Sequence, residues 1–211
     1  MGARRFVGEH AASCLLGTHR AHRWTRAQPG RDDSGRFAAM PSPAATRQAL
    51  APSFSSDDFR RSLSMFATGV TIVTARHADG SLLGLTASSF NSVSLHPPLV
   101  LWSLAQTASS MDALSTGSHY AINILASDQK DLAERFASRS GDRWAGVAFR
   151  AGLAGAPVLD GAAAVFECFN RSRYQEGDHV IFVGEVEHCE HRAGASPLLF
   201  HGGRFYTEHP L

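Results

Sequence analysis

From residue 70 onward the chain repeatedly changes between short strand-forming segments and tight-turn residues, and this pattern limits its possible folds most. Residues 70–77 alternate apolar and polar side chains with the period of two that a strand requires, and residues 78–81 (ADGS) then supply hairpin turn chemistry. Further strand segments are expected at 82–90, 97–104, 119–125, 162–174, 179–191 and 197–206. Because tight turns rather than crossover helices join most of these segments, the pattern predicts a mainly β protein, an antiparallel barrel of six or seven strands with about three short helices.

The first of these helices should follow Ser55 or Ser56, either of which can cap it. Two aspartates stand in its first turn, where they complement the helix dipole. Its apolar stripe consists of Phe59, Leu63 and Phe66. Gly69 stands where a left-handed stop is expected, and two more helices are predicted within 107–117 and 127–141.

Two segments carry more specific expectations. Residues 97–104 (PPLVLWSL) are almost continuously apolar, which is typical of a strand buried on both faces. Residues 140–161 are punctuated by Gly, Ala and Pro without any period, so they are expected to form a long loop of the functional or mobile kind.

The first 52 residues differ in composition from the rest. Residues 1–50 hold eight Arg against three acids, whereas residues 51–211 hold twelve basic groups against sixteen acids. The segment 1–52 shows no lasting periodicity and is predicted to be a disordered extension, with the folded domain at 53–211. An over-long gene start with Met40 as the initiator, or a transit peptide, are the alternatives.

The charge, hydropathy and cysteine content of the chain argue against several classes of protein. The mildly acidic domain argues against nucleic acid as its partner, and no apolar run approaches the ~18 residues that cross a bilayer. Cys14, Cys168 and Cys189 form no C-x-x-C pair, which suits a reducing cytoplasm. The chain has no G-x-G, P-loop, G-x-S-x-G or H-E-x-x-H motif. Within residues 187–191 (EHCEH), His188 and Glu190 share one strand face while Cys189 and His191 share the other, so no metal site is expected.

Hydroxyl side chains gather at two strand ends. They are Thr86, Ser88, Ser89, Ser92 and Ser94 in the first group and Ser103, Thr107, Ser109 and Ser110 in the second. The second group stands at a predicted helix start, where free N–H groups favour phosphate. The two groups either grip one phosphorylated ligand or serve only as caps and turn formers, and the pattern alone leaves both open.

The order of five blocks resembles the flavin reductase family of split-barrel flavoproteins. The blocks are "FATGVTIVTARHADGSLLGLTASSFNSVSLHPPLVLWSL", "YAINILASDQKDLAERFA", "GAPVLDGAAAVFECF", "GDHVIFVGEV" and "PLLFHGGRFY", which together cover roughly residues 57–207. The resemblance implies a six-stranded Greek-key split barrel and a homodimer with flavin at or near the subunit interface. It also implies oxidation of NADH or NADPH to reduce FMN or FAD, and supply of reduced flavin to a separate monooxygenase.

The resemblance also assigns candidate flavin-binding residues block by block. They are Gly69, Val70, Thr71 and Ile72 along the flavin; Thr86, Ala87, Ser88, Ser89 and Phe90, with Ser92 and Val93, at the ring; and Ser103, Leu104, Ala105, Ser109 and Ser110 on the phosphate side. Family members often carry a basic residue in this last block, but residues 99–110 contain none. Phosphate binding would therefore need an Arg from elsewhere, and the choice between FMN and FAD stays open.

His179 interrupts a strand-forming run directly after an acidic turn. By pattern alone it is most simply a turn residue that bonds Asp178 or the backbone. The resemblance instead places it where the nicotinamide enters, as a residue that orients the dihydropyridine ring. Tyr206 and Phe205 either wall the same pocket or are core aromatics.

The predicted function is that of an NAD(P)H:flavin oxidoreductase in the cytoplasm. A flavin carrier without turnover, and a split-barrel oxidase of a phosphorylated pyridoxine-type substrate, are the alternatives. NADPH would need an arginine near its 2′-phosphate, and the candidates are Arg139, Arg143, Arg150, Arg171 and Arg173.

Overall fold

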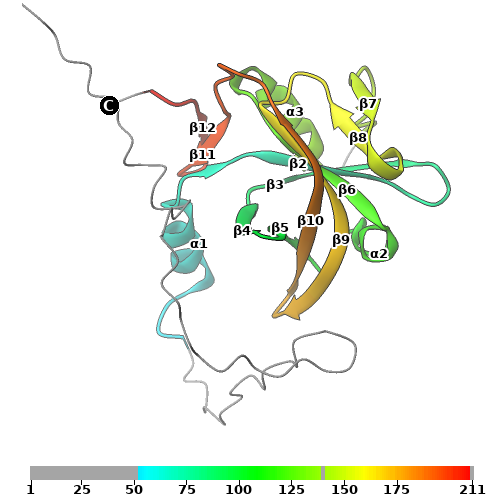
Figure 1. The fold of residues 1–211 in the computed structure, drawn as a ribbon. Helices are drawn as coiled ribbons and strands as arrows, with labels where there is room; N and C mark the ends of the chain where they lie inside the picture. The colour runs from blue at the N-terminus through cyan, green and yellow to red at the C-terminus, as the bar shows by residue number, and fades with distance from the viewer. Residues whose placement is uncertain (1–51, 139–140, 210–211) are drawn as a thin grey trace, which may run out of the picture. The chain divides into compact units, whose positions relative to one another are not determined.

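The main body of the domain is one antiparallel sheet of seven strands (Figure 1). The computed structural model describes residues 52–138 and 141–209. The strands follow the order β3-β2-β6-β9-β10-β5-β4 across the sheet, and every neighbouring pair is antiparallel. Their bounds are β2 Thr71–Arg76, β3 Leu82–Ala87, β4 Asn91–Leu95, β5 Pro98–Ala105, β6 His119–Ile124, β9 Ala164–Glu176 and β10 His179–His191.

The connection between β3 and β4 forces this sheet to curl. The two strands are the opposite edges of the sheet, yet only residues 88–90 separate them in the chain. Six strand spacings in a flat sheet would set the edges about 29 Å apart, whereas a link of three residues spans at most about 14 Å. The Ser89 hydroxyl fastens the closure, because it accepts the Ser103 N–H at 2.9 Å and donates to the Ser103 carbonyl at 3.1 Å. The prediction of a mainly β, antiparallel split barrel is confirmed.

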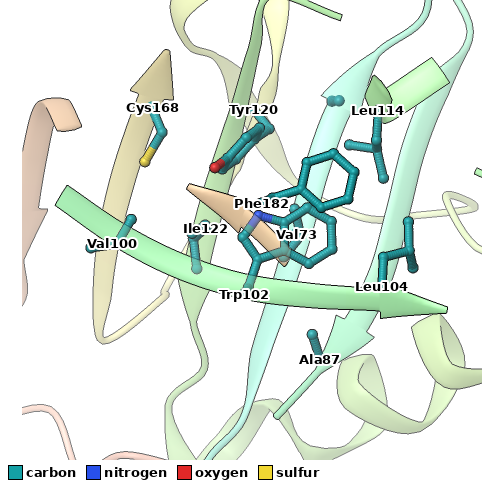
Figure 2. Close-up of a cluster of buried hydrophobic side chains, with 11 residues drawn as sticks. Val73, Ala87, Val100, Trp102, Leu104, Leu114, Tyr120, Ile122, Cys168 and Phe182 are labelled. Atoms are coloured by element: carbon teal, nitrogen blue, oxygen red, sulfur yellow. The ribbon is translucent and has the colours of Figure 1, made fainter. Parts of the chain in front are cut away.

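The curled sheet encloses a core that is rich in aromatic side chains (Figure 2). Trp102 stacks on Phe182 with ring centroids 4.7 Å apart, and Tyr120 meets the Trp102 ring edge-on at 5.7 Å. Cys168 is fully buried in the same cluster. A Cβ at position 184 would overlap the Tyr120 hydroxyl, so Gly184 is the residue that admits this tyrosine to the core.

Two smaller sheets accompany the barrel. One joins β1 Thr68–Gly69, β11 Leu199–His201 and β12 Arg204–Tyr206, and the other pairs β7 Phe149–Ala151 with β8 Pro157–Leu159. The second pair, together with the 3-10 helix η2 Leu153–Gly155, lies inside the segment predicted to be a long loop. That prediction was wrong for 149–159, where buried Val158 and Leu159 tie the segment to the barrel.

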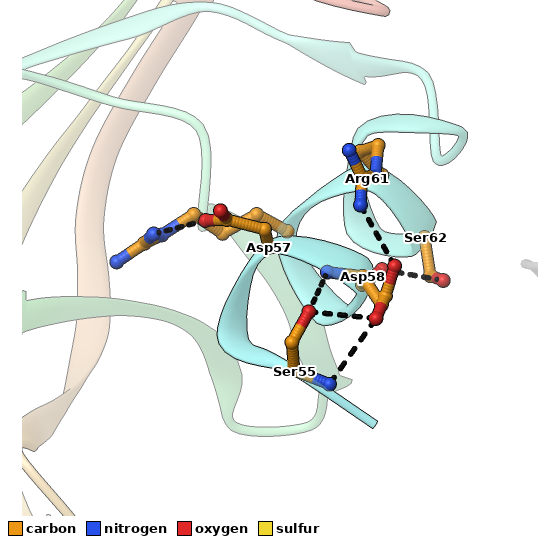
Figure 3. Close-up of polar contacts among 6 residues, drawn as sticks. Ser55, Asp57, Asp58, Arg61 and Ser62 are labelled. Atoms are coloured by element: carbon orange, nitrogen blue, oxygen red, sulfur yellow. Dashed lines mark hydrogen bonds and ion pairs between the residues drawn. The ribbon is translucent and has the colours of Figure 1, made fainter.

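The first helix, α1 Ser56–Ser64, begins as predicted (Figure 3). The Ser55 hydroxyl accepts the Asp58 N–H at 3.1 Å, and the Asp58 carboxylate accepts the Ser55 N–H at 3.2 Å, which completes a capping box. The helix ends at Met65 rather than at Gly69, whose φ is not left-handed. The predicted stop was therefore wrong, because Gly69 is already extended and pairs with Leu199.

The other helices are α2 Met111–Thr116 and α3 Lys130–Ala137, the latter preceded by the 3-10 turn η1 Ser127–Gln129. Strand β5 is not buried on both faces as predicted. Its residues alternate, with Val100, Trp102 and Leu104 in the core and the others half-buried or exposed. The reason is that β5 belongs to a barrel wall, in which only alternate residues point into the enclosed core.

The predicted N-terminal extension lies outside the described residues, except for Pro52. Among the residues that the structure describes, no helix is long and apolar enough to cross a membrane.

Candidate functional site

Two adjoining cavities lie between strand β3 and the C-terminal end of helix α3. Their volumes are about 490 Å³ and 460 Å³, and both are lined by Thr86, Ala137 and Ser138. The Thr86 hydroxyl donates to the Ala133 carbonyl at 2.7 Å, which fastens the strand to the helix where the cavities meet. The two cavities therefore adjoin at Thr86, Ala137 and Ser138.

The first cavity is mainly apolar. Val70, Phe200 and Phe205 line it on one side, and Ala133 of α3 on the other. Glu134 is its only charged lining residue, and this carboxylate pairs with Lys130 at 3.3 Å. A flat apolar ring system is the kind of ligand that such walls accept.

The second cavity has apolar walls, which include Leu85, Leu104 and Phe136, and it also contains several hydroxyl groups and one guanidinium. The hydroxyls come from Thr107, Ser109, Ser110 and Ser138. The Arg143 guanidinium donates one hydrogen bond, at 3.1 Å, to the Gly84 carbonyl, and no carboxylate of the described chain pairs with it. An arginine has five N–H donors, so a half-buried arginine that forms no ion pair with a described carboxylate is a candidate site for an anion.

Several residues predicted from the sequence line this site. They are Val70, Thr86 and Ser88 in the first cavity, with Phe205, and Leu104, Ala105, Ser109 and Ser110 in the second. Helix α2 has six residues, and Ser110 makes no side-chain capping bond to it. Ser110 therefore occupies the N-cap position without a capping hydrogen bond from its hydroxyl, and its role as a turn former or a ligand contact stays a prediction.

Other predicted residues are not part of the cavity lining. Thr71 and Ala87 are buried, and the Thr71 hydroxyl donates to the Ala87 carbonyl at 2.8 Å. Ile72 is buried in a second cluster, against Ala133 and Phe136 of α3. Phe90 packs on the core and stacks on Phe166 with centroids 5.4 Å apart. Ser89 and Ser103 are hydrogen-bonded to one another and close the barrel. Gly69, Ser92, Val93 and Tyr206 are exposed and line neither cavity.

His179 lies at the rim of the site rather than in its wall. It opens β10 directly opposite Ala105, which lines the second cavity. Its Nδ1 atom is 2.7 Å from the Asp178 carboxylate, and 46% of its side chain is exposed. This hydrogen bond lowers the pKa of the Asp178 carboxyl. The pair keeps an imidazole beside the cavity with Nε2 directed to no described partner.

The sequence argument missed the contribution of helix α3. Ala133 and Ala137 are four residues apart on the face that packs toward β3, and Ala133 lines the first cavity while Ala137 lines both. Small residues at helical spacing could have indicated this face. From the sequence, Arg143 is a candidate only for binding the 2′-phosphate of NADPH. Its approach to β3 depends on a loop whose path the sequence does not reveal.

Polar side chains at the end of strand β10, within residues 187–191, form ion pairs with other residues of the chain. Glu187 pairs with His119 at 3.1 Å, and Glu190 pairs with Arg150 at 2.8 Å. Arg150 also pairs, at 3.1 Å, with the buried Glu167. Within 52–138 and 141–209, no group of three His, Cys, Asp or Glu residues is arranged to hold a metal ion.

Comparison with known proteins relates this geometry to characterised families. Residues 59–209 match the family described as flavin reductase like domain. The chain is 45% identical over 150 residues to the FMN reductase (NADH) SmoA of Agrobacterium fabrum, covering 71% of this chain and 84% of that protein. It is 41% identical to the reductase component of the flavin-dependent trigonelline monooxygenase of Acinetobacter baylyi, covering 71% of this chain but only 48% of that longer protein.

Solved structures agree with this relationship. The Streptomyces globisporus NADH:FAD oxidoreductase SgcE6, in complex with NAD and FAD fragments, superposes with a TM-score of 0.70 at 37% identity, over 76% of this chain and 98% of that one. Since the family match spans nearly the whole described domain, the chain belongs to the flavin reductase-like family.

Proposed function

We propose that this flavin reductase binds FMN or FAD in the two adjoining cavities and reduces it with NADH or NADPH. The observation that carries the assignment is that an apolar cavity adjoins one that contains several hydroxyls and Arg143, for which the described residues provide no carboxylate partner. A flavin has the same division, because a flat ring system continues through a polyhydroxyl chain into a phosphate. The residues therefore fit this cofactor in both shape and charge.

Each end of the site has a defined task. Val70, Phe200 and Phe205 provide the apolar walls for the ring system. The guanidinium of Arg143 and the hydroxyls of Ser109 and Ser110 hold the phosphate. Arg143 is thus the arginine from another segment that residues 99–110, which lack any basic group, require.

These residues contribute to catalysis by positioning the flavin and the nicotinamide nucleotide. The bound flavin supplies the ring nitrogen that accepts hydride from the nicotinamide, so the protein needs no general base. The chain must hold the two rings in contact and keep the reactive face free of water. His179, fixed by Asp178 at the rim beside Ala105, orients the carboxamide of the nicotinamide. NADH is the favoured donor, because two relatives, the FMN reductase of Agrobacterium fabrum and the NADH:FAD oxidoreductase of Streptomyces globisporus, are named for it.

The product is reduced flavin for a separate monooxygenase, as the reductase-component relatives suggest. The cytoplasm is the proposed compartment, since Cys168 and Cys189 are both free thiols. A homodimer is proposed as the working form. Helix α1 has an apolar stripe but no buried residue, and Phe59, Leu63 and Phe66 are more than half exposed. A second copy of the chain is the partner that would cover this stripe.

The flavin site is tested by titration of flavin fluorescence with purified protein. Replacing Arg143 with Ala should raise Kd for flavin by about tenfold or more, because a charge-assisted hydrogen bond to phosphate is lost. Arg76→Ala is the matched control, since Arg76 also donates to backbone carbonyls but lines neither cavity. Equal flavin affinity of the Arg143→Ala variant and the wild type would refute the assignment of the phosphate end.

A further inference from the structure

A third cavity of about 230 Å³ continues from the phosphate end of the site. It is lined by Ser109, Ser110 and Arg143, which also line the second cavity. Its volume is below the ~300 Å³ at which independent ligand pockets begin. It is therefore an extension of the same site, reached past the Arg143 guanidinium.

The walls of this extension are held in place by hydrogen bonds to the edge strand β3. The Trp144 indole N–H donates to the Leu82 carbonyl at 3.1 Å, and Arg143 donates to the Gly84 carbonyl at 3.1 Å. The Trp144 ring also meets Phe136 and Phe149 edge-on, with centroids 4.9 Å and 5.3 Å away. The space beside Leu82 and Trp144 is thus formed before any ligand arrives.

The chemistry of the extension differs from that of the phosphate end. Leu82 and Trp144 offer apolar and aromatic surface. Asp142 adds an exposed carboxylate, which accepts the backbone N–H of Trp144 at 3.0 Å and has further acceptor sites. A carboxylate disfavours a second phosphate at this point but can accept hydrogen bonds from an amino group or from ribose hydroxyls. An aromatic base with its ribose is the group that matches these walls.

We infer that the extension beyond Arg143 takes the adenosine of FAD, and that this enzyme prefers FAD to FMN. The inference rests on the proposed flavin site, because the phosphate at Arg143 marks where FMN ends. FAD continues from there through a second phosphate to adenosine, whereas FMN leaves the extension empty. The relatives do not decide the matter, since one is named for FMN and another for FAD.

The test uses a variant whose larger side chain fills the extension, and it compares the affinity of each protein for FAD and for FMN. Leu82→Trp adds bulk to the extension, because Leu82 lines only this one of the three cavities and is half-buried outside the core clusters. Leu153→Trp is the matched control, as Leu153 is half-buried in η2 and lines none of the three. Fluorescence titration with FAD and FMN gives Kd, and steady-state kinetics with FMN as acceptor gives KM for NADH.

The wild type should bind FAD about tenfold more tightly than FMN, and Leu82→Trp should raise Kd for FAD by about tenfold with Kd for FMN unchanged. Leu153→Trp should change neither value.

Equal or tighter binding of FMN by the wild type would overturn the inference, as would an equal loss of affinity for both flavins in Leu82→Trp. A rise in KM for NADH with unchanged Kd for FAD would assign the extension to the adenosine of the nicotinamide nucleotide instead. No binding of either flavin by the wild type would refute the proposed function itself.

Discussion

At the scale of single residues, the pairing of strand β10 with β5 positions His179, which is not buried. It faces Ala105 across the β5–β10 ladder, and its ring is fixed by Asp178 at the tip of the β9–β10 hairpin. The two interpretations of this histidine are therefore compatible, because the bond to Asp178 is present and the ring still lies at the cavity rim. Its contact with a nicotinamide stays a prediction.

Replacing His179 with Ala should raise KM for NADH by about tenfold, the equivalent of one lost hydrogen bond. Flavin affinity should stay within about twofold, because His179 lines neither flavin cavity. Steady-state kinetics together with flavin titration measures both values. If flavin affinity fell as far as NADH affinity, His179 would belong to the flavin contact or to the fold.

The two described cysteines should differ in reactivity. Burial raises the pKa of the Cys168 thiol to about 12, whereas Cys189 is exposed on β10. Since the thiolate is the reactive form, a thiol reagent at neutral pH should label Cys189 and spare Cys168 until the protein unfolds. Peptide mapping by mass spectrometry after brief labelling checks this. Early modification of Cys168 would show that the barrel core opens readily.

At the scale of elements, the contact of α3 with β3 sets the shape of the site. Gly84 allows this contact, because a Cβ there would overlap the Phe136 ring and approach Trp144. Phe136 itself lines the second cavity. The distance between helix and strand, and with it the width of the site, therefore depends on one glycine.

Gly84→Ala should lower the free energy of unfolding by about 1–3 kcal/mol through overpacking, and it should weaken flavin binding as well. Adding Phe136→Leu should recover part of the stability, because the smaller side chain relieves the overlap. Chemical denaturation of the wild type, both single variants and the double variant measures the coupling. Strictly additive effects would contradict the proposed contact.

The strands show how far sequence patterns predict burial. The hairpin of β2 and β3 was predicted correctly, and so were the capped start of α1 and the antiparallel arrangement. The burial of strands β2 and β5 was predicted wrongly. β2 was expected to alternate but is buried from Thr71 to Ala75, and β5 was expected to be buried on both faces but alternates.

The physical reason is that local periodicity does not reveal what covers the outer face of a barrel. The outer side of β2 lies against α3 and β8, and the Thr74 hydroxyl is satisfied there because it donates to the Pro157 carbonyl of β8. A hydroxyl pattern that would normally indicate solvent is thus compatible with burial. The cavity residues on α3 and Arg143 were missed for the same reason, since they come together only through tertiary packing.

At the scale of the whole molecule, the exposed apolar stripe of α1 bears on the assembly. Leu63→Glu places a charge in the middle of this stripe, whereas Arg61→Glu places the same charge on the opposite face. The wild type and Arg61→Glu should sediment as dimers, and Leu63→Glu should shift toward the monomer. Sedimentation velocity measures this, and a wild-type monomer with full activity would contradict the proposed dimer.

The central claim is that the chain passes hydride from a nicotinamide nucleotide to a flavin held in the cavities beside α3. The most direct measurement is the loss of NADH or NADPH absorbance with purified full-length protein, with and without added FMN or FAD. The account predicts oxidation that requires flavin, saturates with it and falls in the Arg143→Ala variant. A protein that binds one flavin tightly but oxidises neither nucleotide above the buffer rate would contradict the claim and mark the barrel as a flavin carrier.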